Sequence, residues 1–217
     1  MNAVIFDMDG LMFDTERVFV LAWDYAGEKI DIGKAGYMVH KTLGMNTAMS
    51  EKILQEEFGD RYDQAELKKY TKEFLTRYYA ENTLPVKKGL YILLEYLKEH
   101  NYKLAVASSS PRWEVEGHLK ETGVYEYFSA VVCGDMTEKS KPEPDIYLKA
   151  CQSLGELPEN CYALEDSRSG LLAAYRAGCK PIMIPDLWQP DEEIESILFA
   201  RFDDLAQFKE FLENQKE

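Results

Sequence analysis

The stretch FDMDGLMFDTE spans residues 6–16 and places four acidic residues directly behind a short apolar run. That run, residues 3–6, is continuously hydrophobic and β-prone, which is typical of a strand buried in a parallel sheet. Asp7, Asp9 and Asp14 crowd around a glycine just after it. Carboxylates this close repel one another, and burying them unpaired is costly. The stretch therefore predicts either a solvated turn or a site that holds something positive.

The pattern changes over residues 15–82. Apolar side chains there recur at helical spacing, as with Leu67, Tyr70 and Phe74, and no segment has a convincing strand pattern. The periodicity breaks around residues 83–86, which predicts a hinge. We expect an all-helical insert that follows the first strand.

Strand and helix patterns alternate after the insert. Further strands are predicted at residues 103–107, 130–133, 161–164 and 181–184. This alternation predicts an α/β fold with a doubly wound, Rossmann-like parallel sheet covered by helices. We expect the core domain to comprise residues 1–14 and 83–217, and the helical domain residues 15–82.

A further helix is predicted between the third and fourth of these strands. It follows Pro144 and is expected to turn Ile146, Ala150 and Leu154 inward, because these residues share one helical face.

Composition limits the classes of partner. The 217 residues are 46% hydrophobic, which is enough for a sizeable core. Thirty-nine acidic against 25 basic residues give a net charge of −14, which argues against nucleic acid or an anionic membrane as the partner. No apolar run approaches the ~20 residues that span a bilayer. An anionic substrate would need a locally positive site.

The spacing of the cysteines bears on the cellular compartment of the protein. Cys133, Cys151, Cys161 and Cys179 have no C-x-x-C spacing, and the predicted first strand leaves no room for a targeting peptide. We expect reduced core thiols in a cytoplasmic protein. Nothing in the sequence suggests more than a monomer.

Polar residues follow several predicted strands, where ligands bind in open parallel sheets. In chain order they are Asp7 and Asp9, then Ser108, Ser109 and Ser110, then Lys141, then Glu165 and Asp166. Oxygen ligands suit Mg²⁺, which usually takes one or two carboxylates together with substrate phosphate oxygens. A cation and a phosphate at this edge of the sheet would explain the acidic cluster.

Each of these groups also has an ordinary explanation. Asp-x-Asp-Gly is often a turn, the serines and the Glu165–Asp166 pair can cap helices, and Lys141 alone can be a surface residue. A calcium-binding EF-hand is disfavoured by the spacing. The succession of the groups at strand ends favours one shared site.

Four segments carry a family resemblance. DMDGLMFDTE, VASSS, KSKPEPD and ALEDSRSG, in this order, resemble the motifs of the haloacid dehalogenase (HAD) superfamily. They resemble in particular the β-phosphoglucomutase-like phosphatases, whose helical cap is inserted after the first strand. The resemblance runs from residue 2 to about residue 186. It implies a Mg²⁺-dependent phosphoric monoester hydrolase that acts on a small phosphorylated metabolite.

The resemblance also implies roles for the acidic residues. Asp7 would be the nucleophile that forms an aspartyl-phosphate, and Asp9 the general acid and base. Mg²⁺ would be held by the carboxylates of Asp7 and Asp166 and by the backbone carbonyl of Asp9. Glu165 would be a further ligand or a support of the ligands.

The remaining roles concern the substrate. Ser108, Ser109 and Lys141 would bind the phosphate group. In the cap, the loop with Lys41, Asn46 and Thr47 is expected to select the substrate. Whether that substrate is a sugar phosphate, a nucleotide or a polyol phosphate stays open.

Alternatives remain. A sugar phosphomutase would use the same phosphoenzyme, but the mutases of the family carry a cap-helix histidine and a cap-loop arginine where this chain has Phe19 and Thr47. A signalling receiver module would have its phospho-acceptor after a middle strand. A dinucleotide-dependent dehydrogenase would show G-x-G-x-x-G after the first strand. A catalytically inactive protein is disfavoured because the expected catalytic residues are all present.

Overall fold

The computed structural model describes residues 3–42 and 47–215, although nothing is described of the Thr47 and Ala48 side chains. The chain divides into two compact units, which are considered separately. Unit 1 comprises Met1–Phe13 and Val86–Glu217, and unit 2 comprises Asp14–Pro85.

Unit 1 contains a six-stranded parallel sheet with the strand order β3-β2-β1-β4-β5-β6. The strands are β1 (Ala3–Phe6), β2 (Lys103–Ser108), β3 (Ala130–Cys133), β4 (Cys161–Glu165), β5 (Lys180–Met183) and β6 (Ala200–Arg201). This is the order of doubly wound Rossmann-like sheets, in which strand order reverses next to β1. The reversal places β1 between β2 and β4.

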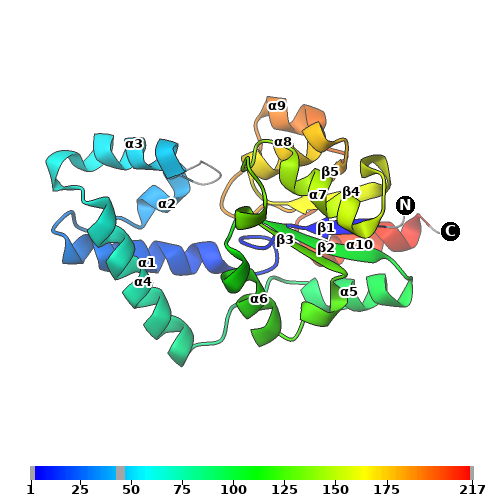
Figure 1. The fold of residues 1–217 in the computed structure, drawn as a ribbon, viewed down its shortest axis with the longest axis horizontal. Helices are drawn as coiled ribbons and strands as arrows, with labels where there is room; N and C mark the ends of the chain where they lie inside the picture. The colour runs from blue at the N-terminus through cyan, green and yellow to red at the C-terminus, as the bar shows by residue number, and fades with distance from the viewer. Residues whose placement is uncertain (1–2, 43–46, 216–217) are drawn as a thin grey trace. The chain divides into compact units, whose positions relative to one another are not determined.

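Helices cover both faces of this sheet (Figure 1). They are α5 (Leu90–Glu99), α6 (Arg112–Glu121), α7 (Asp145–Leu154), α8 (Arg168–Ala177), α9 (Glu192–Ile197) and α10 (Leu205–Asn214). Short 3-10 turns lie at Tyr125–Tyr127, Gly134–Met136 and Pro158–Asn160. Helices α7 and α8 lie on one face and α5 and α6 on the other, with α10 packed beside α5.

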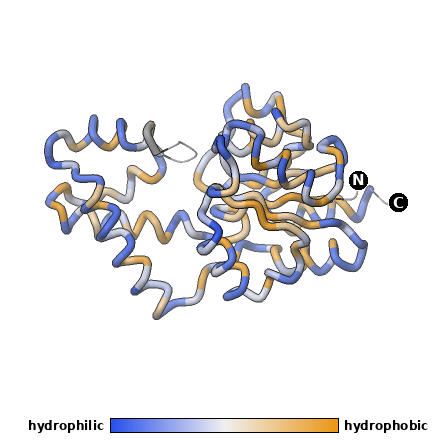
Figure 2. The backbone as a smooth tube through the Cα atoms, in the orientation of Figure 1, coloured by the Kyte–Doolittle hydropathy of each residue, from blue (hydrophilic) through white to orange (hydrophobic). Residues whose placement is uncertain are grey.

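The core follows from the two-residue period of the strands. Ala3 and Ile5 of β1 pack with residues of α7 and α8 in one apolar cluster. The intervening Val4 and Phe6 are also fully buried and point to the opposite face. The central strands are therefore continuous hydrophobic segments, as the colouring of the backbone shows (Figure 2).

In the described residues of unit 2, the regular elements are all helices. Its helices are α1 (Thr15–Lys29), α2 (Tyr37–Thr42), α3 (Thr47–Phe58) and α4 (Gln64–Glu81), with a 3-10 turn at Gly59–Arg61. Its own apolar cluster includes Ala26, Met38, Leu54 and Leu67. Unit 2 thus buries a core of its own.

The structure confirms the predicted α/β class and its parallel, doubly wound sheet. Helix α7 buries Ile146, Ala150 and Leu154, as its spacing predicts. The short elements α9 and β6 were not predicted. In the described residues, no helix is long and apolar enough to cross a membrane.

Candidate active site

The predicted site residues of three adjacent strands meet at one edge of the sheet. Strand β1 pairs with β2 on one side and with β4 on the other, so the carboxyl ends of all three are neighbours. Asp7 prolongs this pairing, because its amide donates to the Leu164 carbonyl at 3.0 Å. Asp7, Ser108 and Glu165 therefore follow or end three strands that lie side by side.

A tight turn sets the spacing of the two acids of the first motif. Gly10 adopts the left-handed conformation with φ of 79°, which glycine adopts without steric cost. The Gly10 amide donates to the Phe13 carbonyl and the Met12 amide to the Met8 carbonyl, both at 2.9 Å. The turn fixes the backbone between Asp7 and the loop that leaves the sheet.

Lys141 is the centre of a buried ion network. Its Nζ atom lies 2.5 Å from Asp7 Oδ1, 2.6 Å from Glu165 Oε1 and 3.0 Å from the Ala107 carbonyl oxygen. An ammonium group has three donors, and here each has an acceptor. The Tyr147 hydroxyl also donates to Glu165 Oε1, at 2.5 Å. Lys141 therefore joins the ends of β1, β2 and β4.

Burial dominates the electrostatics of this network. It raises the pKa of Asp7 well above its usual range, Glu165 and Asp9 add to the shift, and Lys141 opposes it. For Lys141, burial alone would lower the pKa, but the carboxylates of Asp7 and Glu165 outweigh it and raise the pKa. Lys141 is thus held as a cation, and additional positive charge at the site would favour ionised Asp7.

Asp9 has different surroundings. It is half-buried, and its Oδ2 atom accepts a hydrogen bond of 2.8 Å from the Ser110 hydroxyl and a long one of 3.5 Å from Ser108. The Ser108 hydroxyl oxygen in turn accepts from the Ser110 amide at 3.1 Å. The serine-rich end of β2 therefore holds the second acid.

The acidic residues fit a divalent cation. Carboxylate oxygens of Asp7, Glu165 and Asp166 lie within 4.8 Å of one another, and all three residues are buried. The Lys141 ammonium group lies beside the same cluster. Clustered carboxylate oxygens are ligands that suit Mg²⁺. Both oxygens of Glu165 already accept hydrogen bonds, Oε1 from Lys141 and Tyr147 and Oε2 from Ser167.

Not every predicted residue joins this site. Ser109 is exposed, and Ser110 rather than Ser109 contacts Asp9. In unit 2, Lys41 forms a 3.0 Å ion pair with Glu57. Asn46 lies outside the described residues, and so does the side chain of Thr47, which begins α3.

The sequence interpretation missed Tyr147 and Glu114. Tyr147 interrupts the inward-facing apolar positions of α7, and a polar group among them was an available signal. Glu114 lies in the first turn of α6; burial raises its pKa to about 7, and the negative charge of Asp9 adds to the shift. No sequence pattern pointed to Glu114.

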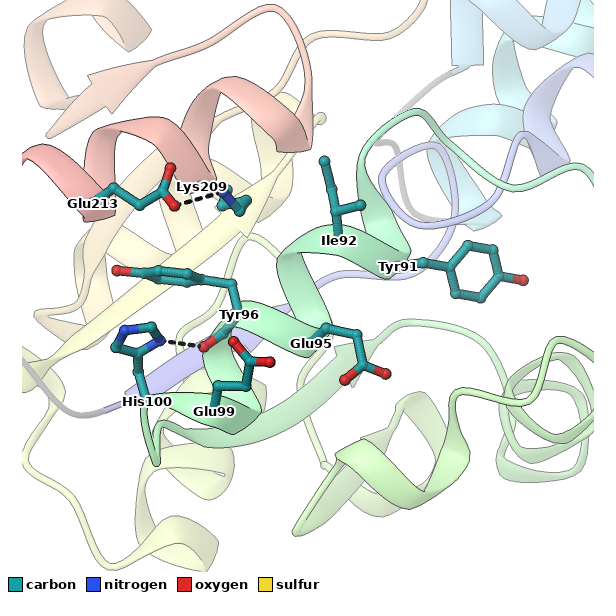
Figure 3. A pocket seen from close by; sticks show the side chains of 8 residues that line it. All are labelled: Tyr91, Ile92, Glu95, Tyr96, Glu99, His100, Lys209 and Glu213. Carbon is teal, nitrogen blue, oxygen red and sulfur yellow. Dashed lines mark hydrogen bonds and ion pairs between the residues drawn. The ribbon is translucent and has the colours of Figure 1, made fainter.

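A surface groove elsewhere in unit 1 is separate from these residues (Figure 3). It lies between α5 and α10 and is lined by Tyr91, Ile92, Glu95, Tyr96, Glu99, His100, Lys209 and Glu213. Its polar groups are partly paired internally, because Lys209 donates to Glu213 at 2.7 Å and His100 contacts the Tyr96 carbonyl at 2.8 Å. None of the strand-end residues lines this groove.

The protein is therefore of the doubly wound α/β class, with buried carboxylates and a lysine beyond the ends of its parallel strands. Comparison with known proteins identifies the family: the model of the family described as haloacid dehalogenase-like hydrolase matches residues 4–184. The chain therefore belongs to this family.

Relatives and solved structures agree with this. The chain is 33% identical to the phosphorylated carbohydrates phosphatase of Thermotoga maritima, over 84% of each chain. It is 32% identical to the beta-phosphoglucomutase of Bacillus subtilis, over 82% of this chain and 80% of that protein. The crystal structure of CbbY from Rhodobacter sphaeroides in complex with phosphate superposes with a TM-score of 0.79, at 28% identity over 96% of each chain. The expected family, and a phosphoric monoester hydrolase within it, are confirmed.

Proposed function

We propose that the protein is a Mg²⁺-dependent phosphatase that hydrolyses a small phosphorylated metabolite through an aspartyl-phosphate on Asp7. The observation that carries this proposal is the buried contact of 2.5 Å between Asp7 Oδ1 and Lys141 Nζ, with Asp9 two residues further along the same turn. A carboxylate held by an ammonium group, next to a second carboxylate, suits nucleophilic attack coupled to proton transfer.

The first half-reaction transfers the phosphoryl group to the protein. An Asp7 carboxylate oxygen attacks phosphorus, an oxygen–phosphorus bond forms, and the bond from phosphorus to the leaving oxygen breaks. Asp9, protonated at this point, gives its proton to the leaving alkoxide. Lys141 and the buried Ser108 hydroxyl bind the phosphoryl oxygens and offset their negative charge.

The second half-reaction regenerates the protein. Asp9, now ionised, takes a proton from a water molecule, and the resulting hydroxide attacks phosphorus. The bond between phosphorus and Asp7 breaks, which releases inorganic phosphate and restores the Asp7 carboxylate. The hydrogen bond from Ser110 keeps the Asp9 carboxylate next to this reaction.

Asp7, Asp166 and the backbone carbonyl of Asp9 would hold the Mg²⁺ ion. When bound, the ion offsets charge on the transferring phosphoryl group and orients it. The buried cluster of carboxylate oxygens from Asp7, Glu165 and Asp166 supports this assignment.

A phosphomutase is the second candidate, because one relative is named beta-phosphoglucomutase. We favour the hydrolase, since Phe19 and Thr47 stand where the family's mutases carry a histidine and an arginine.

A panel of phosphate monoesters with Mg²⁺ tests the proposed function. Sugar phosphates and nucleoside monophosphates belong in it, together with β-glucose 1-phosphate and a trace of the 1,6-bisphosphate. We expect release of inorganic phosphate from at least one monoester. Formation of glucose 6-phosphate much faster than inorganic phosphate would favour the mutase instead.

We further infer a cytoplasmic monomer. The support for the compartment is that all four cysteines are free and buried, as expected in a reducing environment.

A further inference from the structure

The Glu165 carboxylate is enclosed by protein on every side. The residue is fully buried, and its Oε1 atom accepts from both Lys141 Nζ and the Tyr147 hydroxyl. Its Oε2 atom accepts from the Ser167 hydroxyl at 3.1 Å. Gly170 of α8 packs against the same carboxylate, because a Cβ atom there would lie 1.9 Å from Glu165 Cδ. The Glu165 side chain is therefore held in one position at the end of β4.

Tyr147 donates a hydrogen bond to Glu165, and its aromatic ring contacts Lys141. It is fully buried in the first turn of α7, and its hydroxyl lies 2.5 Å from Glu165 Oε1. Lys141 Nζ lies 5.3 Å from the centre of the Tyr147 ring, within the range of a cation–π contact. Both contacts of Tyr147 are thus made to the ion network of the site.

We propose that Tyr147 is a positioning residue: its hydroxyl fixes the Glu165 carboxylate, and through Glu165 it fixes Lys141 against Asp7. This inference rests on the proposed function only where it concerns turnover. Nothing in the geometry brings Tyr147 itself to the reacting atoms.

The physical reason lies in the freedom of the lysine. A lysine side chain has four flexible methylene groups, so its ammonium group is located by its acceptors. One of the three acceptors is a backbone carbonyl, another is the nucleophile Asp7, and the third is Glu165 Oε1. Without the tyrosine hydroxyl, Oε1 would lose one of two donors, and Glu165 and Lys141 could shift together. The contact with Asp7 would then be less well defined.

The decisive variant is Tyr147→Phe, which removes one hydroxyl and keeps the ring. We expect kcat to fall by about 10- to 100-fold, the free energy of one hydrogen bond to a charged group. Tyr162→Phe is the matched control, because Tyr162 is buried in β4 and contacts only aromatic rings such as Phe208 and Phe199 among its described contacts. The control is expected to keep its kcat.

A double-mutant cycle separates positioning from simple stability. If Tyr147 acts through Glu165, then Tyr147→Phe should lower kcat much less in a Glu165→Gln background than in the wild type. Equal effects in both backgrounds would overturn the proposal. So would a Tyr147→Phe variant that unfolds at lower temperature but keeps its kcat.

A second readout does not depend on turnover. In metal-free protein, the buried ammonium protons of Lys141 should exchange slowly with water by nitrogen-detected NMR, and Tyr147→Phe should speed this exchange. Unchanged exchange in folded Tyr147→Phe would contradict the inference even if the protein hydrolysed none of the monoesters tested. Faster exchange together with no hydrolysis by the wild type would leave the positioning role supported and the proposed function refuted.

Discussion

Asp7 and Asp9 are separated by one residue, yet their surroundings differ. Asp7 is buried and contacts an ammonium group, whereas Asp9 is half-buried and contacts hydroxyl groups. In the proposed mechanism these environments suit different roles, with Asp7 held in place for attack and Asp9 placed to exchange protons with substrate and water.

Asp9→Asn should slow turnover by about two to four orders of magnitude, the usual worth of a positioned acid and base. The amide keeps the size of the side chain and still accepts a hydrogen bond from Ser110, but it carries no proton to exchange. Steady-state kinetics on the best monoester of the panel would measure the effect. Wild-type kcat in this variant would assign the proton transfer to another group.

The raised pKa of Glu114 predicts that the free energy of unfolding of the protein depends on pH. Burial raises its pKa to about 7, so the protein holds this carboxyl protonated more readily than the unfolded chain does. Its stabilising contribution is present below the unfolded value, near 4.5, and is lost as the pH rises through about 7. Glu114→Gln, which cannot ionise, should therefore gain stability relative to the wild type between pH 5 and 8, by about 1–2 kcal/mol after allowance for its partial exposure.

Denaturant unfolding of metal-free protein at several pH values tests this. Glu116→Gln is the control on the same helix, because hydrogen bonds from Lys120 and Arg112 lower the pKa of Glu116. The control should lose stability by an amount that stays constant between pH 5 and 8, because the pKa of Glu116 lies below that range in both the folded and the unfolded chain. A Glu114→Gln variant whose relative stability did not change with pH would show that the carboxyl is solvated.

Helix α8 depends on the absence of a side chain at one position. Ser167 caps the helix by accepting from the Gly170 amide at 3.1 Å, and Gly170 lies directly on the Glu165 carboxylate. Because Lys141 and Tyr147 hold that carboxylate from the other side, it has nowhere to move.

Gly170→Ala should destabilise the protein by about 1–3 kcal/mol through overpacking and should also lower kcat. Gly117→Ala in α6 is the matched control, because a Cβ atom there meets no atom within 4 Å and alanine favours a helix. Thermal unfolding should therefore give opposite signs for the two variants. Equal stability of Gly170→Ala and the wild type would mean that Glu165 is not held as described.

The regular elements were largely predictable from the sequence. Residues 3–6 and 130–133 were predicted as strands with the bounds that the structure shows, because buried parallel strands read as continuous apolar runs. Helix α9 and strand β6 were missed, since six and two residues give too short a pattern and depend on their neighbours for stability.

The site was predictable only in part. The topology of parallel sheets brings strand ends together, so Asp7, Ser108 and Glu165 could be expected as neighbours. The sequence does not show how α7 is rotated, and the contact of Tyr147 with Glu165 depends on that rotation. Nor does the sequence distinguish Ser109 from Ser110 as the partner of Asp9, because both follow the same strand.

Activity of the whole protein should require the metal. Chelation should remove phosphatase activity and added Mg²⁺ should restore it, because the clustered carboxylate oxygens of Asp7, Glu165 and Asp166 suit this ion. Asp166→Ala should raise the Mg²⁺ concentration needed for half-maximal activity, whereas Glu126→Ala, at an exposed residue of unit 1, should leave it unchanged. An unaltered Mg²⁺ requirement in Asp166→Ala would exclude that carboxylate as a ligand.

The phosphoenzyme is the central claim, and acid-quench labelling tests it most directly. The protein is mixed with a radiolabelled phosphate monoester and Mg²⁺, quenched in acid within one turnover, and assayed for covalently bound phosphate. We predict that the wild type carries label on Asp7, and that folded Asp7→Asn carries none and does not turn over. Turnover by Asp7→Asn, or label on a different residue, would contradict the mechanism.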